Sequence, residues 1–187
     1  MTSPRRQGLE AAPDEILVER ASQGDAAAFE ALIRRHSPLM RAYVSRIVGS
    51  VTEADDVVQD SLYTAWRRLP ELRDPKAVKA WLMQIASRQA FKHLRRRPPE
   101  DPFPILEAAH PSETQPENVA IRNAQLQALA TALDTLPSDL RQAWLLREVA
   151  ELSYDDIAKQ LNIPRTTVRG KLSRARASIF AQMEEWR

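Results

Sequence analysis

The sequence predicts an all-α protein of two small helical domains, over residues 14–97 and 117–187, joined by a linker over residues 98–116. Three observations predict this class. Apolar residues recur at helical intervals in both halves of the chain. The chain has only four glycines and few runs of β-branched residues, a composition that disfavours strands. Six of its 13 prolines lie between residues 98 and 120, where they oppose helix and indicate a linker.

The overall composition indicates where the protein acts. The chain has 27 Lys and Arg against 25 Asp and Glu, so the position of the charges matters more than the net charge of +2. It has no cysteine, which excludes disulfides and thiolate metal sites. No apolar run reaches membrane-spanning length, and residues 1–13 lack the apolar core of a signal peptide. We expect a soluble, cytoplasmic protein with no direct membrane insertion and a disordered N-terminus over residues 1–13.

The first domain begins with apolar residues spaced as in packed helices. Gly24–Asp25 separates a first helix from a second, and Ser37–Pro38 indicates a joint or kink within the second. Residues 49–52 close this segment, with Thr52 as the expected cap of the next helix. The expected core residues are Ile16, Leu17, Ala21, Phe29, Leu32, Ile33, Leu39, Tyr43, Val44, Ile47 and Val48.

A helix over residues 53–69 is expected to have an acidic outer face. Asp56 and Asp60 are like charges one turn apart, which weakens an isolated helix by about 0.3 kcal/mol, so a partner outside the helix could use them. The alternative is an ordinary solvated acidic face. The expected buried stripe is Ala54, Val58, Leu62, Ala65 and Leu69, and the expected outer residues are Glu53, Asp56, Gln59, Asp60 and Arg67.

A third helix is expected to start near Pro75, after a polar loop over residues 72–75, and to end in a basic cluster. Such an amphipathic helix suits a nucleic-acid backbone. Trp81 is expected in the core and Phe91 is undecided, with stacking on an unpaired base as the alternative for either residue. The cluster is Arg88, Lys92, His93, Arg95, Arg96 and Arg97.

The linker over residues 98–116 is acidic and has no Lys or Arg. It either follows a positive channel on a partner or acts as a solvating tether. The second domain begins near Glu117, and a break at Leu136–Pro137 precedes a helix that Ser138 is expected to cap. The first helix of this domain carries Val119, Ile121, Leu126, Leu129, Ala130 and Leu133.

The stretch from Leu152 to Arg176 has the pattern of a helix-turn-helix. Ser153 is placed to cap its first helix, Asn162 tolerates the left-handed conformation that ends it, and Pro164 suits the start of the second. The inward stripe of the second helix is Val168, Leu172, Ala175 and Ile179, and its outer face is Thr166, Gly170, Ser173, Arg174 and Ala177.

The charges of this second helix indicate DNA binding. Arg174 can reach a guanine edge between small neighbours, and no acid occurs from residue 164 to residue 181. A solvated basic helix on an ordinary bundle is the alternative. The flanking cations, which most often meet phosphates, are Arg165, Arg169, Lys171 and Arg176.

Four blocks of sequence carry a family resemblance. GDAAAFEALIRRHSPLMRAYVSRIVG resembles sigma region 2.1, EADDVVQDSLYTAWRRL region 2.2, KAWLMQIASRQAFKHLRR regions 2.3 and 2.4, and LDTLPSDLRQAWLLREVAELSYDDIAKQLNIPRTTVRGKLSRAR region 4. Together, over about residues 14–97 and 117–181, they resemble an extracytoplasmic function (ECF) sigma factor. Such factors are the compact sigma-70 family subunits that give bacterial RNA polymerase its promoter choice.

The resemblance implies the partners and the contact residues. The partners are core RNA polymerase, through the coiled coil of its largest subunit and its flap, promoter DNA, and a cognate anti-sigma factor that would hold the chain at the membrane. The polymerase-docking residues would be Asp56, Gln59 and Asp60. The minus-ten promoter element would be contacted by Leu72, Arg73, Asp74, Lys76, Arg88, Lys92, Arg95 and Arg96. The minus-thirty-five element would be contacted by Arg165, Thr166, Thr167, Arg169, Gly170, Lys171, Ser173 and Arg174.

Three positions depart from the family pattern and bear on promoter sequence. Arg88 stands where many members have Asn, Gly170 where Ser is frequent, and Thr166 where Gly is common. Gly170 also costs helix stability of up to about 1 kcal/mol.

Two other classes of function fit less of the chain. A conventional helix-turn-helix regulator would have no use for the acidic helix and would usually need a dimer surface. An enzyme is disfavoured because His36, His93 and His110 are scattered and no phosphate loop or thiol is present. We therefore expect no catalytic residue, no metal and no cofactor.

Overall fold

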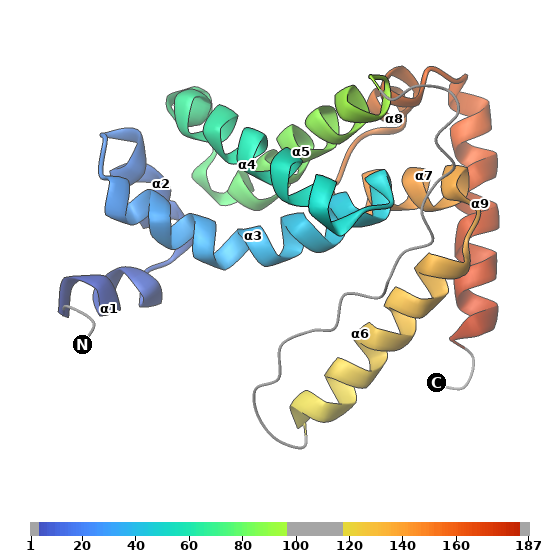
Figure 1. Ribbon diagram of the computed structural model, residues 1–187, viewed down its shortest axis with the longest axis horizontal. Coiled ribbons are helices and arrows are strands. Elements are labelled where there is room, and N and C mark those ends of the chain that lie inside the picture. The colour runs from blue at the N-terminus through green and yellow to red at the C-terminus, as the bar shows by residue number, and fades with distance from the viewer. Residues whose placement is uncertain (1–3, 97–117, 184–187) are drawn as a thin grey trace. The chain divides into compact units, whose positions relative to one another are not determined.

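The computed structural model describes the backbone of residues 4–96 and 118–183 and the side chains of residues 8–96 and 124–183. Within these ranges it consists of helices and turns without strands, which confirms the all-α class (Figure 1). The chain forms two compact units, residues 1–101 and residues 102–187. The expected linker, residues 98–116, lies outside the described residues.

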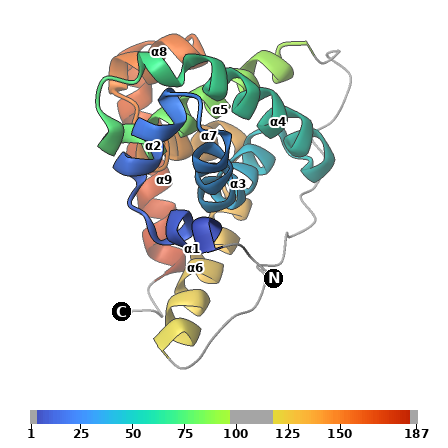
Figure 2. The same cartoon turned by 90° about the vertical axis from the view of Figure 1, so that its left-hand side faces the viewer.

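The first unit is a bundle built around one long helix. α3 packs against α2, α4 and α5, and α4 also packs against α5, so these helices surround a common core (Figures 1 and 2). Two 3-10 turns, η1 and η2, connect α4 to α5. The bounds are α1 (Pro4–Ala11), α2 (Asp14–Ser22), α3 (Ala26–Val48), α4 (Val51–Arg68), η1 (Leu69–Glu71), η2 (Pro75–Ala77) and α5 (Val78–Leu94).

Within the segment expected to be disordered, residues 1–13, the structure has helix α1 over Pro4–Ala11. Leu9 is 3% exposed, and α1 contacts α3. The Arg35 guanidinium of α3 donates hydrogen bonds to the backbone oxygens of Glu10 and Ala12, each at 2.8 Å, and pairs with Asp14. These partners lie more than 20 residues apart in the chain, so no local pattern predicts the order of α1.

The start of α3 is confirmed, but of the two alternatives at Ser37–Pro38, a joint or a kink, the joint is excluded because the helix is continuous, and the expected cap of α4 is wrong. Asp25 caps α3 by accepting hydrogen bonds from two backbone amides, and the hydrogen bond from Arg20 lowers the pKa of its carboxyl. α3 continues through Pro38, because buried side chains on both sides of the proline hold it in the core. Ser50, not Thr52, caps α4 by accepting from the Glu53 amide at 3.3 Å.

Most of the expected core of the first unit is buried, with a few exceptions. Ile16 is 44% exposed and Leu39 37%, and Ile33 and Leu62 are only partly buried. Val57 and Ser61 are buried instead, because α4 packs against two helices and therefore buries a wider face. The confirmed core residues are Leu17, Ala21, Phe29, Leu32, Tyr43, Val44, Ile47, Val48, Ala54, Val58, Ala65 and Leu69.

One buried polar contact joins α3 to α5. The Tyr43 hydroxyl is hydrogen-bonded to Ser87, whose hydroxyl also donates to the Met83 carbonyl at 2.7 Å. Burial raises the pKa of the Tyr43 hydroxyl. Both polar groups are therefore satisfied inside the core, which fixes the register of the two helices.

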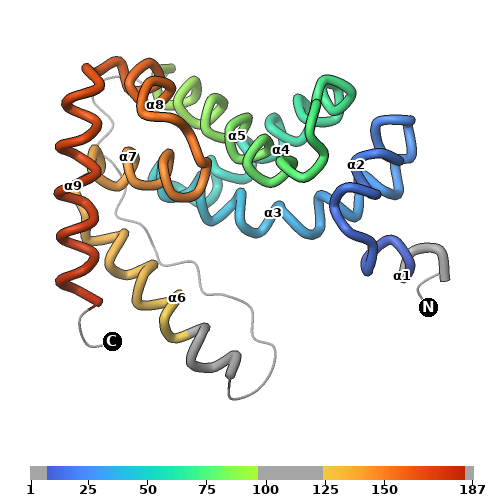
Figure 3. The backbone as a smooth tube through the Cα atoms, turned by 180° about the vertical axis from the view of Figure 1, so that it is seen from behind, coloured from blue at the N-terminus to red at the C-terminus, as the bar shows by residue number. Residues whose placement is uncertain are grey.

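The second unit contains the predicted helix-turn-helix. α9 packs against α6, α7 and α8. Figure 3 shows that the C-terminal end of α6 is the part of that helix nearest to α9, and that the two helices diverge from there. Ser138 is the first residue of α7 and makes no capping bond, so that predicted cap is wrong. The bounds are α6 (Asn118–Thr135), α7 (Ser138–Glu148), α8 (Tyr154–Leu161) and α9 (Arg165–Gln182).

The turn between α8 and α9 has the predicted geometry. The Ser153 hydroxyl accepts from the Asp156 amide at 3.1 Å and caps α8. Asn162 ends α8 with φ 53° and ψ 49°, in the left-handed region. The inward residues of α9, namely Val168, Leu172, Ala175 and Ile179, are all buried as predicted.

Replacing Asn162 by alanine is expected to lower the free energy of unfolding of the second unit by about 1 kcal/mol. Alanine pays the steric cost of the left-handed conformation without a compensating contact, whereas glycine adopts it freely. Asn162→Gly should therefore stay within about 0.5 kcal/mol of the wild type. Urea denaturation followed by circular dichroism measures both changes. Equal stabilities of the two variants would contradict this explanation.

None of the helices in the two described ranges combines the length and apolar character needed to cross a bilayer.

Candidate nucleic-acid and protein interfaces

The outer face of α4 carries the expected docking residues. Asp56, Gln59 and Asp60 are all exposed, because the buried side chains of α4 lie on its opposite side. The offsets of three and four residues place them on one stripe of the helix. The sequence prediction that they share an outer face is therefore confirmed in geometry.

The acids around this face differ in their partners. Asp55 pairs with Arg41 of α3, with Nε and Oδ1 2.6 Å apart, and Glu53 pairs with His93 at the end of α5. Within the described part of the chain, no cation pairs with Asp56 or Asp60. These two carboxylates are therefore available to a basic partner, which the sequence could not show.

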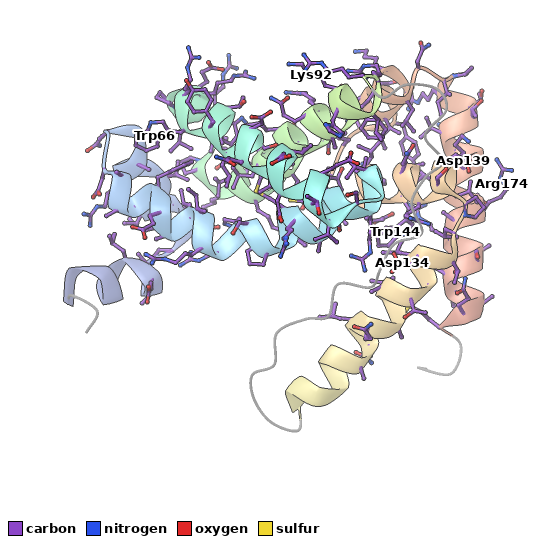
Figure 4. The ribbon with its side chains drawn as sticks, viewed as in Figure 1. Trp66, Lys92, Asp134, Asp139, Trp144 and Arg174 are labelled. Atoms are coloured by element: carbon purple, nitrogen blue, oxygen red, sulfur yellow. The ribbon has the colours of Figure 1, made fainter. Side chains whose placement is uncertain are left out.

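The basic end of α5 is exposed as expected. Arg88, Lys92, Arg95 and Arg96 all point to solvent and have no acidic partner among residues 8–96 and 124–183. Figure 4 shows Lys92 on the outer side of the unit. His93, which was predicted to belong to this cluster, is hydrogen-bonded to Glu53 instead. The positive charge of this surface thus comes from arginine and lysine.

The two aromatic residues of α5 have different environments. Phe91 is 7% exposed and belongs to the core, which resolves the open alternative. Trp81 is only partly buried, so its predicted core position is wrong. Its offsets of 7, 11 and 14 residues to Arg88, Lys92 and Arg95 place it on the same outer stripe. These offsets are the sequence pattern that indicates an outer position for Trp81.

The loop between α4 and α5 is held in a defined shape. The Asp74 carboxylate accepts from the Lys76 amide at 3.0 Å, and Pro70 and Pro75 occupy the first turns of η1 and η2. α2 packs against both turns, a support that the sequence did not indicate. Leu72 is partly exposed, and the exposed loop residues are Arg73, Asp74 and Lys76.

The outer face of α9 combines small side chains with one long donor. Thr166, Gly170 and Ser173 are exposed, and Thr167 is partly buried. A Cβ added at Gly170 would meet nothing within 4 Å, so packing does not require glycine there. The Arg174 side chain points away from the unit, with its Nε 3.3 Å from the Gly170 carbonyl (Figure 4).

Two of the cations that flank this face are paired with acids of α7. Lys171 has a side chain only 14% exposed and pairs with Asp139 of α7, whose carboxyl pKa this contact lowers. Arg176 pairs with Glu148 at 2.6 Å, and that hydrogen bond raises the pKa of the guanidinium.

Other cations of α9 are bound loosely or not at all. Arg165 is 3.5 Å from Asp155 with both side chains more than half exposed, a weak contact. Arg169 and Arg174 have no acidic partner in the described ranges. The positive charge that α9 presents to solvent is therefore carried mainly by these three arginines.

The described residues contain no group of three or more His, Asp or Glu side chains arranged to hold a metal ion.

Comparisons with known proteins match both units. The family model for sigma-70 region 2 matches residues 32–98, and the model for sigma-70 region 4 matches residues 126–179. These matches cover the α4–α5 surfaces and the helix-turn-helix, the same two places where the exposed charges gather.

Individual relatives match over nearly the whole chain. The ECF RNA polymerase sigma-E factor of Salmonella typhimurium is 37% identical over 176 residues, covering 89% of this chain and 92% of the relative. The RNA polymerase sigma-H factor of Pseudomonas aeruginosa is 35% identical, with 89% and 91% covered. Among solved structures, the sigma factor RpoE of Bartonella quintana, in complex with the anti-sigma factor NepR, is similar with a TM-score of 0.54. It is 25% identical, and the match covers 83% of this chain and 96% of that one. With these matches in both units, the chain belongs to the ECF RNA polymerase sigma factors of the sigma-70 family.

Proposed function

We propose that this chain is an alternative sigma factor that binds core RNA polymerase, directs it to specific promoters and assists strand opening. The proposed docking on the polymerase rests on one observation: two carboxylates of α4 have no cationic partner in the described residues. Asp56 and Asp60 face solvent without a cation, while neighbouring Asp55 is neutralised by Arg41. Such a face attracts a basic helical surface, and with Gln59 it would dock on the coiled coil of the polymerase largest subunit.

The α5 stripe and the loop before it would bind the minus-ten element. Arg88, Lys92, Arg95 and Arg96 supply unpaired positive charge along one side, which suits the phosphates of a melted strand. Trp81 on the same stripe adds an aromatic face for an unstacked base. The loop would receive a flipped base through Leu72, Arg73, Asp74 and Lys76, because its two 3-10 turns hold it ready before DNA arrives.

α9 would read the minus-thirty-five element in the major groove. Arg174 would contact a base edge, with Thr166, Gly170 and Ser173 allowing close approach. Arg165 and Arg169 would lie on phosphates, with Thr167 beside them. Lys171 would add to the phosphate contact only in competition with Asp139, since its ammonium is already paired.

This difference between the cations predicts different effects on salt dependence. Arg169→Ala should lower the slope of log affinity against log salt concentration by about 1, because it removes one phosphate contact. Lys171→Ala should change the slope less and should instead lower thermal stability, by up to about 1 kcal/mol. Holoenzyme binding to a duplex selected from a random pool, measured across salt concentrations, tests this. An equal loss of slope in both variants would contradict it.

The remaining partners follow from family membership. The second unit would meet the flap of the polymerase, and the polymerase itself would make the RNA. The similarity to RpoE, whose solved complex contains NepR, supports a cognate anti-sigma factor for this chain as well. The site of action would be the cytoplasm, with the anti-sigma factor holding the chain at the membrane until it is released.

The test of the proposed function is reconstitution. The purified chain is mixed with bacterial core RNA polymerase that lacks any sigma subunit, and the complex is presented with a pool of random duplexes. We expect stable binding to the core enzyme, selection of duplexes that share two spaced elements, and transcripts that start at one position. Selection of duplexes by the chain alone as a dimer, with no binding to the core enzyme, would favour a conventional regulator instead.

A further inference from the structure

Tyr63 of α4 is the most exposed large apolar side chain in the described part of the chain, at 65%. Scattered exposed apolar residues are ordinary on a soluble protein, and Ile16 and Leu39 need no further explanation. Tyr63 differs because of the residues around it. It lies three residues after Asp60 and seven after Asp56, which places all three on one stripe of the helix.

The structure of the first unit does not use the Tyr63 ring. The aromatic residue that α4 contributes to packing is Trp66, whose ring centroid lies 4.9 Å from that of Phe29 (Trp66 is labelled in Figure 4). Tyr63 instead points outward, with the Arg67 guanidinium over its ring at 5.9 Å from the centroid. This cation–π contact limits the motion of the ring, so that less entropy is lost when a partner covers it.

Arg67 itself has no acidic partner within residues 8–96 and 124–183. Its neighbour Arg68 does, pairing with Glu71 at 2.8 Å. The solvent side of α4 therefore carries carboxylates at Asp56 and Asp60, an aromatic ring at Tyr63 and, over that ring, the Arg67 guanidinium without an acidic partner in the described ranges. With a rise of about 1.5 Å per residue, this surface extends over about 16 Å of the helix.

We propose that the polymerase-docking surface of α4 continues from Asp56 to Arg67, and that Tyr63 is its aromatic anchor. The proposal rests on the proposed docking of Asp56, Gln59 and Asp60 and extends that surface by about two helical turns. The occupant is the coiled coil of the polymerase largest subunit, with basic side chains opposite the carboxylates, an apolar pocket around Tyr63 and an acid beside Arg67. Tyrosine and arginine are enriched among the residues that dominate interface affinity.

The charge of the surface favours protein over nucleic acid as this occupant. Asp60 lies about 4.5 Å along the helix axis from Tyr63, and a strand stacked on the ring would bring its phosphates toward that carboxylate. Among the described residues, Arg67 is the one cation of this stripe, whereas α5 carries a row of cations suited to phosphate, including Arg88 and Lys92.

The experiment measures the affinity of the full chain for core RNA polymerase without promoter DNA. Tyr63→Ala should weaken binding by about 10-fold or more, and Arg67→Ala by about 3-fold, while Tyr63→Phe stays within about 3-fold of the wild type. Ile16→Ala, which removes another exposed apolar side chain on α2, is the matched control and should bind as the wild type does. Thermal unfolding should be unchanged in all four variants, because none of these side chains is buried.

The outcomes separate this inference from the proposed function. If the Asp56→Ala, Asp60→Ala double variant loses affinity while Tyr63→Ala binds like Ile16→Ala, the extension is wrong and the docking proposal stands. If the wild type does not bind the core enzyme, both are wrong. If Tyr63→Ala binds the core enzyme normally but loses affinity for a single-stranded oligonucleotide, the occupant is nucleic acid and the inference is overturned.

Discussion

Replacing Asp56 and Asp60 together by alanine is expected to lower the affinity of the chain for core RNA polymerase by about 30-fold to 1,000-fold. This corresponds to about 2 to 4 kcal/mol, the range for removing desolvated charges from an interface. The loss should appear mainly as faster dissociation, and it should shrink at high salt as the charges are screened. Titration of fluorescently labelled chain with core enzyme at two salt concentrations measures it.

Asp55 is the matched control for this double change. It is an exposed aspartate on the same helix, but Arg41 already neutralises it. Asp55→Ala should therefore change the affinity for the core enzyme by less than about 3-fold and stability by less than about 1 kcal/mol. Equal losses for Asp55→Ala and for the double variant would show that general negative charge, rather than the Asp56–Asp60 face, attracts the polymerase.

Arg174→Ala is expected to relax base choice at one position of the minus-thirty-five element by about 1 to 3 kcal/mol, or about 5-fold to 150-fold. The guanidinium is the one long donor on the outer face of α9 and has no acidic partner in the described ranges, so its loss leaves the fold intact. Binding of holoenzyme to a set of duplexes with single substitutions measures the change. The holoenzyme should bind the preferred duplex more weakly, and base substitution at one position of that duplex should no longer reduce its affinity.

Two further variants distinguish base reading from charge. Arg174→Lys keeps the charge but loses the planar fork, so it should keep affinity better than Arg174→Ala while still losing the base preference. Arg169→Ala should weaken binding to every duplex by a similar factor. A uniform loss for Arg174→Ala as well would assign Arg174 to phosphate and leave the base contacts to Thr166 and Ser173.

The local features of the fold could be predicted because their signals are local. The buried stripe of α9 follows from side-chain spacing, and the break at Gly24–Asp25, the cap at Ser153 and the end of α8 at Asn162 follow from the conformations that these residue types favour. The errors occurred where several helices meet. Trp81 was expected in the core because its ring is large and apolar, but the packing of α5 leaves it partly exposed on the stripe that also carries Arg88 and Lys92.

The sequence by itself determined the helical class, the helix-turn-helix, the gathering of acids on α4 and of cations on α5 and α9, and the family. Only the tertiary structure decided which of these charges are neutralised. Lys171 meets Asp139 across 32 residues, Arg176 meets Glu148 across 28, and His93 meets Glu53 across 40. The physical reason is that the formal charge of a residue is a property of that residue, whereas its availability depends on which distant groups packing brings within a few ångströms.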